Sequence, residues 1–306
     1  MKKILAVALL CAAMIFSFAN ANAQLSKNSK KLSAFTSIEA GYEFEITVKQ
    51  SENYKVEWAV DEIVADLVKI NQQGSVLRLG FDSKGMTKEQ KKHYKGKEAP
   101  KLTLKAVVYT PSLESITLAD NAKLYASDAT FKANGFTLMM KDESSITGIN
   151  IQSNSALIQT SGKALANVSL ESKRTDVRGE KKSSVSLKVK NCDQLNINAD
   201  GDFALAVNGD VNNEVYIQSA GSSKIALGKG TTKELVFTSK NSAELAAKEF
   251  AAKKVELHMA GGSAVVNATE DLKLELKGGS NVLFLNDPII EIVLIEKSNI
   301  APYDKK

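Results

Sequence analysis

Residues 195–225, LNINADGDFALAVNGDVNNEVYIQSAGSSKI, hold one repeating unit and the start of the next, and they decide the fold. Each unit opens with two apolar residues separated by one position, passes a glycine, and reaches a further apolar residue. The two copies, 20 positions apart, are Leu195, Ile197, Gly201 and Leu205, then Val215, Ile217, Gly221 and Ile225. Alternation with a period of two indicates a strand, and glycine supplies the backbone freedom that a tight corner needs. Each unit is therefore expected to be two short strands joined at a corner.

The same period continues on both sides of this stretch. A first apolar column reads Leu165, Val185, Leu205, Ile225, Leu245, Val265 and Leu285. A second reads Leu157, Val177, Ile197, Ile217, Phe237 and Leu257, and a third reads Leu195, Val215, Leu235 and Val255. A turn column reads Gly201, Gly221, Asn241 and Gly261. A unit of two strands cannot bury its apolar face alone, whereas stacked units can. The pattern of leucine-rich repeats is absent, so the sequence predicts an all-β protein, a parallel β-helix with units of about 20 residues.

The rest of the chain divides around this solenoid. Residues 24–306 are expected to form one domain, in which 35–110 alternate as a small β-meander that caps the solenoid of residues 111–287. In the solenoid's first part, Ile116 and Leu118 recur as Phe136 and Leu138. Residues 288–306 are expected to be a terminal strand and tail.

The terminal strand is apolar on both faces from Ile289 to Ile295. An exposed apolar edge strand invites aggregation, so this segment is expected to be buried. It would lie either as a cap near Leu283 and Leu285 or in a contact between copies of the chain.

Residues 1–23 read as a secretory signal, with Lys2 and Lys3, an apolar stretch, and a small-residue cleavage site. Export through the Sec pathway to the periplasm, the cell surface or the medium follows. The net charge of +5 becomes +3 without the two lysines, which is too weak for a nucleic-acid partner. No later segment is long and apolar enough to span a bilayer, so an integral membrane protein is not expected.

Several motifs accompany the repeat columns: Phe35-x-x-Ile38, Phe44-Glu-Ile46-Thr-Val48, Val76-Leu-Arg-Leu79, and the turns at residues 220–223, 260–263 and 277–280. Together they resemble the bacterial head-GIN-domain family, which is described as autotransporter adhesins. The chain departs from the family's Gly-Ser-Gly turns at Lys240-Asn-Ser242 and Asp200-Gly-Asp202. The resemblance implies a β-solenoid, export and adhesion, and it brings no catalytic residues.

Nucleophilic catalysis would need a histidine beside Cys192, and only His93 and His258 exist. His93 lies in a Lys-rich loop over residues 84–97, and His258 follows core residue Leu257 and should point outward. A buried structural cysteine is the simpler interpretation, and no catalytic residue is assigned.

Two polar groups are candidate sites. Arg174, Asp176 and Arg178 alternate and should share one outward face, where they could grip the carboxylate of an acidic sugar or form a surface ladder. Asp200 and Asp202 could hold a calcium ion, although aspartates at a corner are usually turn formers.

These features favour a non-enzymatic, exported envelope protein, an adhesin or a module that binds a glycan or a surface protein. No cofactor is expected. The alternatives are a carbohydrate-active enzyme, a lyase or hydrolase, on the same solenoid, or a purely structural envelope component.

Overall fold

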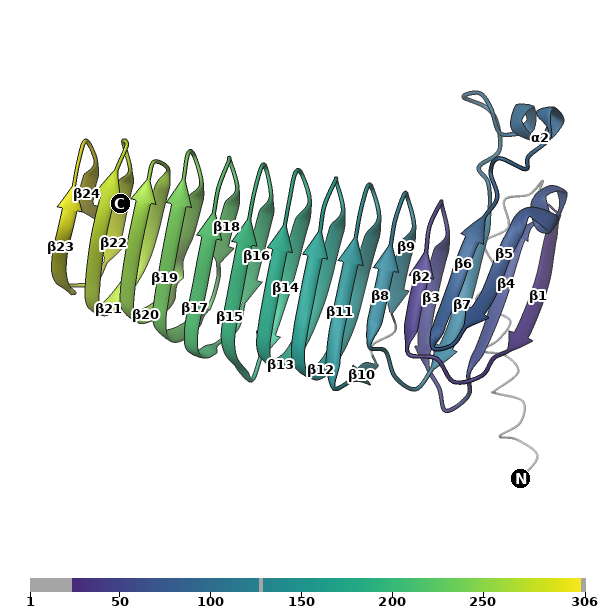
Figure 1. The fold of residues 1–306 in the computed structure, drawn as a ribbon, viewed down its shortest axis with the longest axis horizontal. Coiled ribbons are helices and arrows are strands. Elements are labelled where there is room, and N and C mark those ends of the chain that lie inside the picture. Colours follow the sequence, from purple (N-terminus) through teal and green to yellow (C-terminus); the bar gives the residue numbers. More distant parts are fainter. Residues whose placement is uncertain (1–23, 127–128, 304–306) are drawn as a thin grey trace.

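The computed structural model describes residues 24–126 and 129–303, which form a rod built almost wholly of strands (Figure 1). The signal sequence predicted for residues 1–23 lies outside the described residues. The rod contains a β-solenoid of about nine turns of roughly 20-residue units. The predicted fold class is therefore confirmed.

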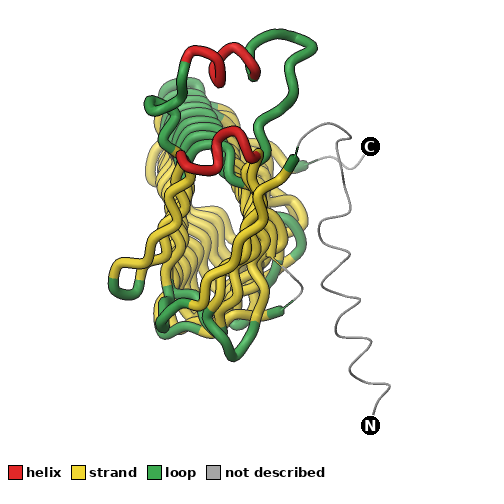
Figure 2. Tube along the Cα trace, turned by 90° about the vertical axis from the view of Figure 1, so that its right-hand side faces the viewer, coloured by secondary structure: helices red, strands yellow, loops and turns green. Residues whose placement is uncertain are grey.

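Each turn of the solenoid gives one strand to each of two walls, and strands within a wall are parallel. Wall A contains β3 (Glu45–Gln50), β9 (Lys123–Ala126), the first parts of β12 (Ser145–Thr160) and β13 (Leu165–Gly179), β14 (Ser184–Lys190), β16 (Ala204–Asn208), β18 (Lys224–Leu227), the first parts of β20 (Glu244–Ala260) and β21 (Ser263–Lys277), β22 (Asn281–Leu285) and β24 (Asn299–Pro302). Wall B contains β2 (Ser37–Ala40), β8 (Ser115–Leu118), β11 (Gly135–Met140), the second parts of β12, β13, β20 and β21, β15 (Cys192–Ala199), β17 (Val211–Ser219), β19 (Gly230–Lys240) and β23 (Ile289–Ile295). The short β10 (Thr130–Lys132) adds to β12 where the walls meet. Figure 2 shows the two walls end-on.

The apolar columns form the core between the walls. Ile225 is 1% exposed and lies beside Leu205 on one side and Leu245 on the other, as predicted. The third predicted column is also in register, and it continues into Leu272.

Three ends of the predicted columns are wrong by one to three positions. Ala166, not Leu165, lies beside Val185, and Leu165 is 55% exposed. Ile158, not Leu157, lies beside Val177. The first column continues from Leu245 through Ala264 and Val282, so Val265 and Leu285 lie outside it. Ile116 lies beside Leu138, not Phe136. The cause is that the number of residues per turn of the solenoid varies. One or two residues added or lost at a corner shift every later residue relative to a fixed step of 20 positions.

One corner of each turn is built on left-handed backbone. The predicted turn column has φ values of 71° at Gly201, 68° at Gly221, 65° at Asn241 and 96° at Gly261. A Cβ on Gly221 would lie 2.8 Å from the backbone nitrogen and oxygen of Gly201. Glycine is therefore needed there both for conformation and for close stacking of successive turns.

A second glycine makes room for an aromatic ring. Gly179 ends β13, and a Cβ at this position would overlap the ring of Phe203 in the next turn. Phe203 is fully buried. The ring of Phe203 in the next turn thus occupies the space that a side chain at position 179 would take.

The amino-terminal end of the rod is covered by a polar cap. Antiparallel β1 (Leu25–Lys31), β4 (Lys55–Asp61) and β7 (Leu104–Thr110) extend wall A, while β5 (Val68–Gln73) and β6 (Val76–Phe81) extend wall B. A 3₁₀ helix, η2 (Glu62–Leu67), links β4 and β5. Trp58 is partly buried and packs against the core.

The Lys-rich segment leaves the rod at this end and contains the short helix α2 (Lys88–His93) (Figures 1 and 2). Thr87 caps this helix through a capping box with Gln90. The short helices of residues 24–126 and 129–303 include none with the length and apolar character to cross a bilayer.

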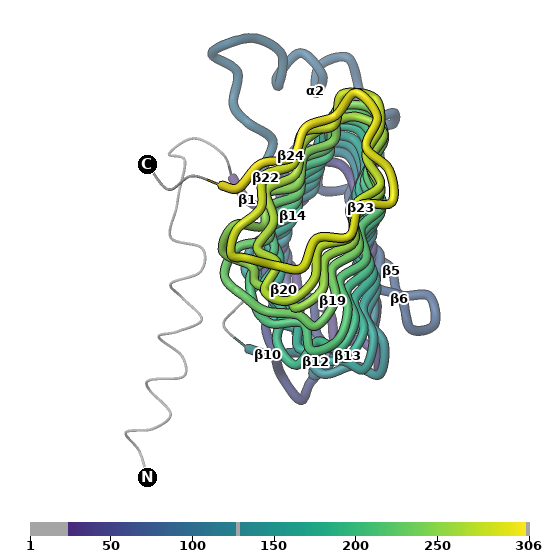
Figure 3. The backbone as a smooth tube through the Cα atoms, turned by 90° about the vertical axis from the view of Figure 1, so that its left-hand side faces the viewer, coloured from purple at the N-terminus to yellow at the C-terminus, as the bar shows by residue number. Residues whose placement is uncertain are grey.

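The carboxyl-terminal end is the last turn itself (Figure 3). β23 lies on β21, with Ile290 beside Leu272 and Ile292 beside Leu274, and β24 lies on β22. The expectation that Ile289–Ile295 is buried near Leu283 and Leu285 is wrong for the single chain. Ile289 is 75% and Ile292 is 58% exposed, because the last turn has no neighbour on its outer side.

Candidate functional site

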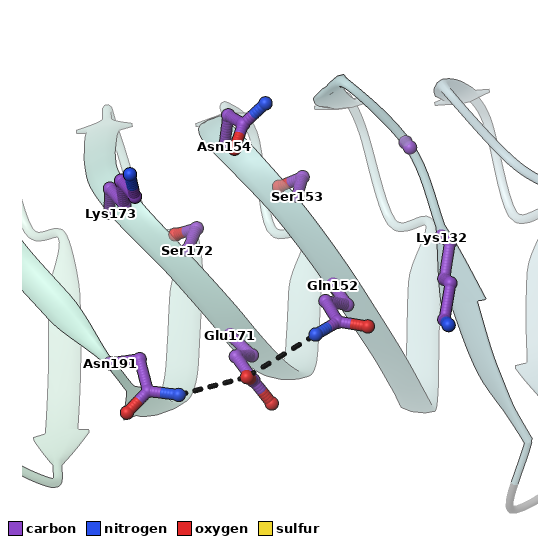
Figure 4. Close-up of a pocket in the computed structure, with 9 residues that line it drawn as sticks. Lys132, Gln152, Ser153, Asn154, Glu171, Ser172, Lys173 and Asn191 are labelled. Atoms are coloured by element: carbon purple, nitrogen blue, oxygen red, sulfur yellow. Dashed lines mark hydrogen bonds between the residues drawn. The ribbon is translucent and has the colours of Figure 1, made fainter.

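A shallow polar groove crosses the corner where the chain passes from wall A to wall B (Figure 4). Its volume is about 380 Å³. The groove spans successive turns and is lined by Lys132, Ala133, Gln152, Ser153, Asn154, Glu171, Ser172, Lys173 and Asn191. Stacked parallel turns bring these residues together from four separate places in the sequence.

Glu171 is the centre of the groove's hydrogen bonding. Its carboxylate accepts from Asn191 Nδ2 at 2.8 Å, Gln152 Nε2 at 3.3 Å and Lys190 Nζ at 3.4 Å. The bond from Asn191 is the main cause that lowers the pKa of Glu171, against the opposing effect of partial desolvation. The groove therefore holds an oriented, ionised acceptor.

Lys132 and Lys173 stand at the rim of the groove. Both are exposed, and neither ammonium group forms a hydrogen bond or ion pair with another described residue. Two unpaired cations beside one paired carboxylate give the groove a positive balance. Such an arrangement suits a ligand with hydroxyl groups and scattered negative charge.

The predicted Arg174, Asp176 and Arg178 lie just beyond the groove on wall B. They share the outward face, as the alternation indicates, with Val177 buried between them. Arg174 binds Asp176 through two hydrogen bonds, Nε to Oδ2 at 3.1 Å and Nη2 to Oδ1 at 3.2 Å. In the next turn, Asn196 Nδ2 donates to Asp176 Oδ1 at 2.8 Å.

The hydrogen bonds among Arg174, Asp176 and Asn196 set the charge on the outward face of wall B. Burial alone would raise the pKa of Asp176, but hydrogen bonds from Arg174 and Asn196 hold it below its usual range. Arg174 is thus largely engaged by its own neighbour. Arg178 has no hydrogen bond or ion pair within the described part of the chain and is the cation of the three that is left for a ligand.

Asp200 and Asp202 flank Gly201 at the opposite corner, and both are exposed. Across residues 24–126 and 129–303, no group of three or more histidine, cysteine, aspartate or glutamate side chains is placed to hold a metal ion. The structure brings these two carboxylates to a turn without a third ligand of that kind.

Within the described residues, Cys192 forms no hydrogen bond with His93 or His258, one of which a nucleophilic cysteine would need. Cys192 is fully buried, and its sulfur lies 3.3 Å from the Gln194 carbonyl and 4.0 Å from Thr175 Oγ1. Burial raises the pKa of this thiol. His258 points outward, as expected, between Glu256 at 2.9 Å and Glu275 at 3.1 Å.

The segment between β6 and β7, which carries α2, forms an excursion from the rod. A larger hollow of about 1080 Å³ lies between this excursion and the wall below it. Buried Asp61 anchors the excursion, because its Oδ2 accepts from Tyr94 Oη at 3.1 Å and from the Thr103 amide at 3.0 Å. Burial and the nearby carboxylate raise the pKa of Tyr94. Sequence reasoning missed this hollow, since its lining comes from segments of irregular length.

The fold agrees with a comparison to protein families. A family model described as "Putative auto-transporter adhesin, head GIN domain" matches residues 34–216 and 180–288. The chain belongs to this family. The resemblance drawn from the motifs is therefore confirmed. Among curated proteins, no sequence matches the chain.

Solved structures resemble this head GIN chain over most of its length. A putative adhesin from Parabacteroides merdae is 21% identical with a TM-score of 0.43, over 92% of this chain and 98% of that one. A putative adhesin from Parabacteroides distasonis is 16% identical with a TM-score of 0.49, over 92% and 98%. A putative lipid binding protein from the same species is 16% identical with a TM-score of 0.47, over 93% and 98%.

Proposed function

We propose that this protein is a non-enzymatic, exported binding module of the cell envelope whose corner groove holds an acidic glycan. Membership of an adhesin family supports a role in binding surface molecules. The predicted signal sequence supports export, with the periplasm, the cell surface or the medium as destination.

One observation carries the ligand class. The groove joins an oriented carboxylate at Glu171 to the amides of Gln152 and Asn191 and to the unpaired ammonium groups of Lys132 and Lys173. Amides and carboxylates bond sugar hydroxyls, and free ammonium groups attract uronate or sulfate. Successive turns lie about 4.8 Å apart, close to the length of one monosaccharide in a chain. A polymeric ligand can therefore place one ring over each turn.

Arg178 extends the proposed surface along wall B. Its guanidinium is exposed and points to the same side as Arg174 and Asp176. The three residues form a second contact for a carboxylate of the same glycan, with Arg178 as the binding cation and Asp176 orienting Arg174. The carboxylates of Asp200 and Asp202 are proposed to be turn residues without an ion.

The test begins with a glycan array probed by the protein produced from residue 24 onward. An acidic glycan retained on the array is then titrated against the double variant Lys132→Ala, Lys173→Ala. Its affinity should fall at least roughly tenfold, the effect of losing one charge-assisted hydrogen bond.

The matched control is Lys188→Ala, Lys229→Ala, which removes two exposed lysines elsewhere on the rod. It changes the net charge equally and should leave affinity within about twofold once salt is at physiological strength. Equal losses for both variants would show non-specific attraction, and retention of neutral glycans alone would contradict the proposed ligand class.

A further inference from the structure

The two ends of the rod differ in how they meet solvent. At the amino-terminal end, the outermost strand β1 carries Lys27, Lys30 and Lys31, and charged residues on an edge strand oppose pairing with other chains. At the other end, the outermost strand β23 reads IIEIVLI. A solenoid needs a polar terminal unit to stay soluble, and among residues 24–126 and 129–303 it is formed at the amino-terminal end alone.

The exposed residues of the last turn form one apolar surface, which we call the terminal patch. Its members are Ile289, Ile290, Ile292, Val293 and Leu294. Ile290 and Ile292 continue the inward columns of Leu272 and Leu274 and are open along the rod axis. Ile289 and Leu294 lie on the outer side of the wall, over Asp271 and Glu275. The patch thus wraps from the open core onto the wall.

The backbone at this end is also unpaired. Within the described chain β23 pairs with β21 alone and β24 with β22 alone, so the outer edge of each has no neighbouring strand. β24 ends on Pro302, which lacks an N–H group, whereas β23 has seven residues and no proline. β23 is therefore the better edge for adding a strand.

We propose that the terminal patch joins two copies of this chain end to end about a two-fold axis, with β23 of each copy paired to β23 of the other. A two-fold axis that runs across the rod, perpendicular to wall B, reverses the strand direction of the second copy. Strands that are parallel within each rod consequently meet antiparallel at the junction, and antiparallel pairing satisfies both free edges.

Charge at the two ends of β23 supports this antiparallel pairing. Asp287 precedes the strand and Lys297 follows it, and neither forms an ion pair with another described residue. Antiparallel pairing places the start of each strand by the end of the other, so Asp287 meets Lys297 twice. Glu296 also lies at that end, but it interacts with Lys277 of its own chain.

The last turn comes close to the size of one side of a dimer contact. It runs from Asn286 to Tyr303, 18 residues by their numbers, and a stable interface uses about 20–30 residues a side. Its centre is aliphatic except for Glu291, which lies beside Lys273 of its own chain, and its ends are charged. An apolar centre with a charged rim is the usual arrangement of a homodimer contact.

The experiment uses the chain from residue 24 onward in analytical ultracentrifugation with light scattering. A dimer is expected, and Ile292→Glu should raise its dissociation constant by roughly 30-fold or more. The control is Leu165→Glu, which adds the same charge at an exposed leucine on wall A and should leave the dimer intact. Equal circular dichroism for both variants shows that the rod is folded.

Two further variants test the two-fold arrangement. Ile292→Cys lies near the proposed axis and should form a disulfide with its own copy, while Leu165→Cys should not. Asp287→Lys should weaken the dimer, and adding Lys297→Asp should restore it. A monomer at high concentration, a dimer insensitive to Ile292→Glu, or open-ended growth from head-to-tail contacts would each overturn the proposal, whatever the glycan experiments show.

Discussion

The sharpest test of the solenoid register is the substitution Ile225→Asp. Ile225 is 1% exposed between Leu205 and Leu245, so the introduced carboxyl would lie in an apolar column. Loss of the isoleucine side chain alone costs about 2–5 kcal/mol. The carboxyl adds a second penalty, because the folded state must keep it protonated.

That second penalty depends on pH in a defined direction. A buried carboxyl has a raised pKa when folded, so its penalty is absent below the unfolded pKa of about 3.9 and grows by about 1.4 kcal/mol per pH unit above it, until the folded pKa is reached. At pH 7 it can reach about 4 kcal/mol. The sum of about 6–9 kcal/mol is comparable with the whole stability of a typical domain.

The assay is urea unfolding followed by circular dichroism at pH 7 and pH 4, with the unsubstituted protein measured at each pH. Ile225→Asp should lose most of its stability at pH 7 and recover part of the loss at pH 4. Ala226→Asp is the control, since the adjacent residue points outward from the same strand. If the two variants unfold alike at pH 7, or if the loss is independent of pH, the register is wrong.

The remaining predictions concern four other features. Gly179→Ala should cost about 1–3 kcal/mol in urea unfolding because its methyl group meets Phe203, and adding Phe203→Leu should recover part of this loss; strictly additive losses would refute the contact. Asp176→Asn should lower the free energy of unfolding at pH 7 by about 1 kcal/mol or less. Because the pKa of Asp176 is lowered in the folded state, the difference from the unsubstituted protein should vanish as pH falls through that pKa. A difference that persists in acid would count against the hydrogen-bond network around Asp176. In the chain from residue 24 onward, Cys192 should resist a thiol reagent until unfolding, because it is fully buried, so rapid labelling of the native protein would show an open corner. EDTA, and the double change Asp200→Asn, Asp202→Asn, should leave the melting temperature almost unchanged, and a large drop on chelation would reveal a metal.

The alternation of apolar and polar residues predicted much of the fold. It placed Val177 inside and Arg174, Asp176 and Arg178 outside, because side-chain direction depends only on parity within one strand. Register between strands depends on every corner in between. Leu157 and Leu165 were therefore misplaced, since a turn of 19 residues beside them broke the twenty-residue step.

The groove could not be predicted for the same reason. Gln152, Glu171 and Asn191 lie 19 and 20 positions apart and meet at the corner, where turn length varies. A shift of one residue would point Glu171 elsewhere. Composition alone gives no signal for it, because glutamine, asparagine and lysine are ordinary on any solvated surface.

The terminal strand shows a different limit. Its apolar character on both faces was read correctly, but the inference that this chain buries it was wrong. A sequence shows what a strand needs to contact. It does not show that the contact comes from the same molecule, and the last turn of a stack has a neighbour on one side alone.

The direction of the backbone hydrogen bonds has a mechanical consequence. They run along the rod between successive turns, while the strands run across it (Figure 1). Tension applied to the two ends of one rod therefore pulls each bond along its length, and the chain peels from a free end one bond at a time. In a single rod that has no second copy on β23, the turn formed by β23 and β24 is held on one side only and can detach without the rupture of any other turn. Each turn of roughly 20 residues that comes away lengthens the tether by about 60 Å, which makes the rod extend under load in discrete steps while the remaining turns stay folded.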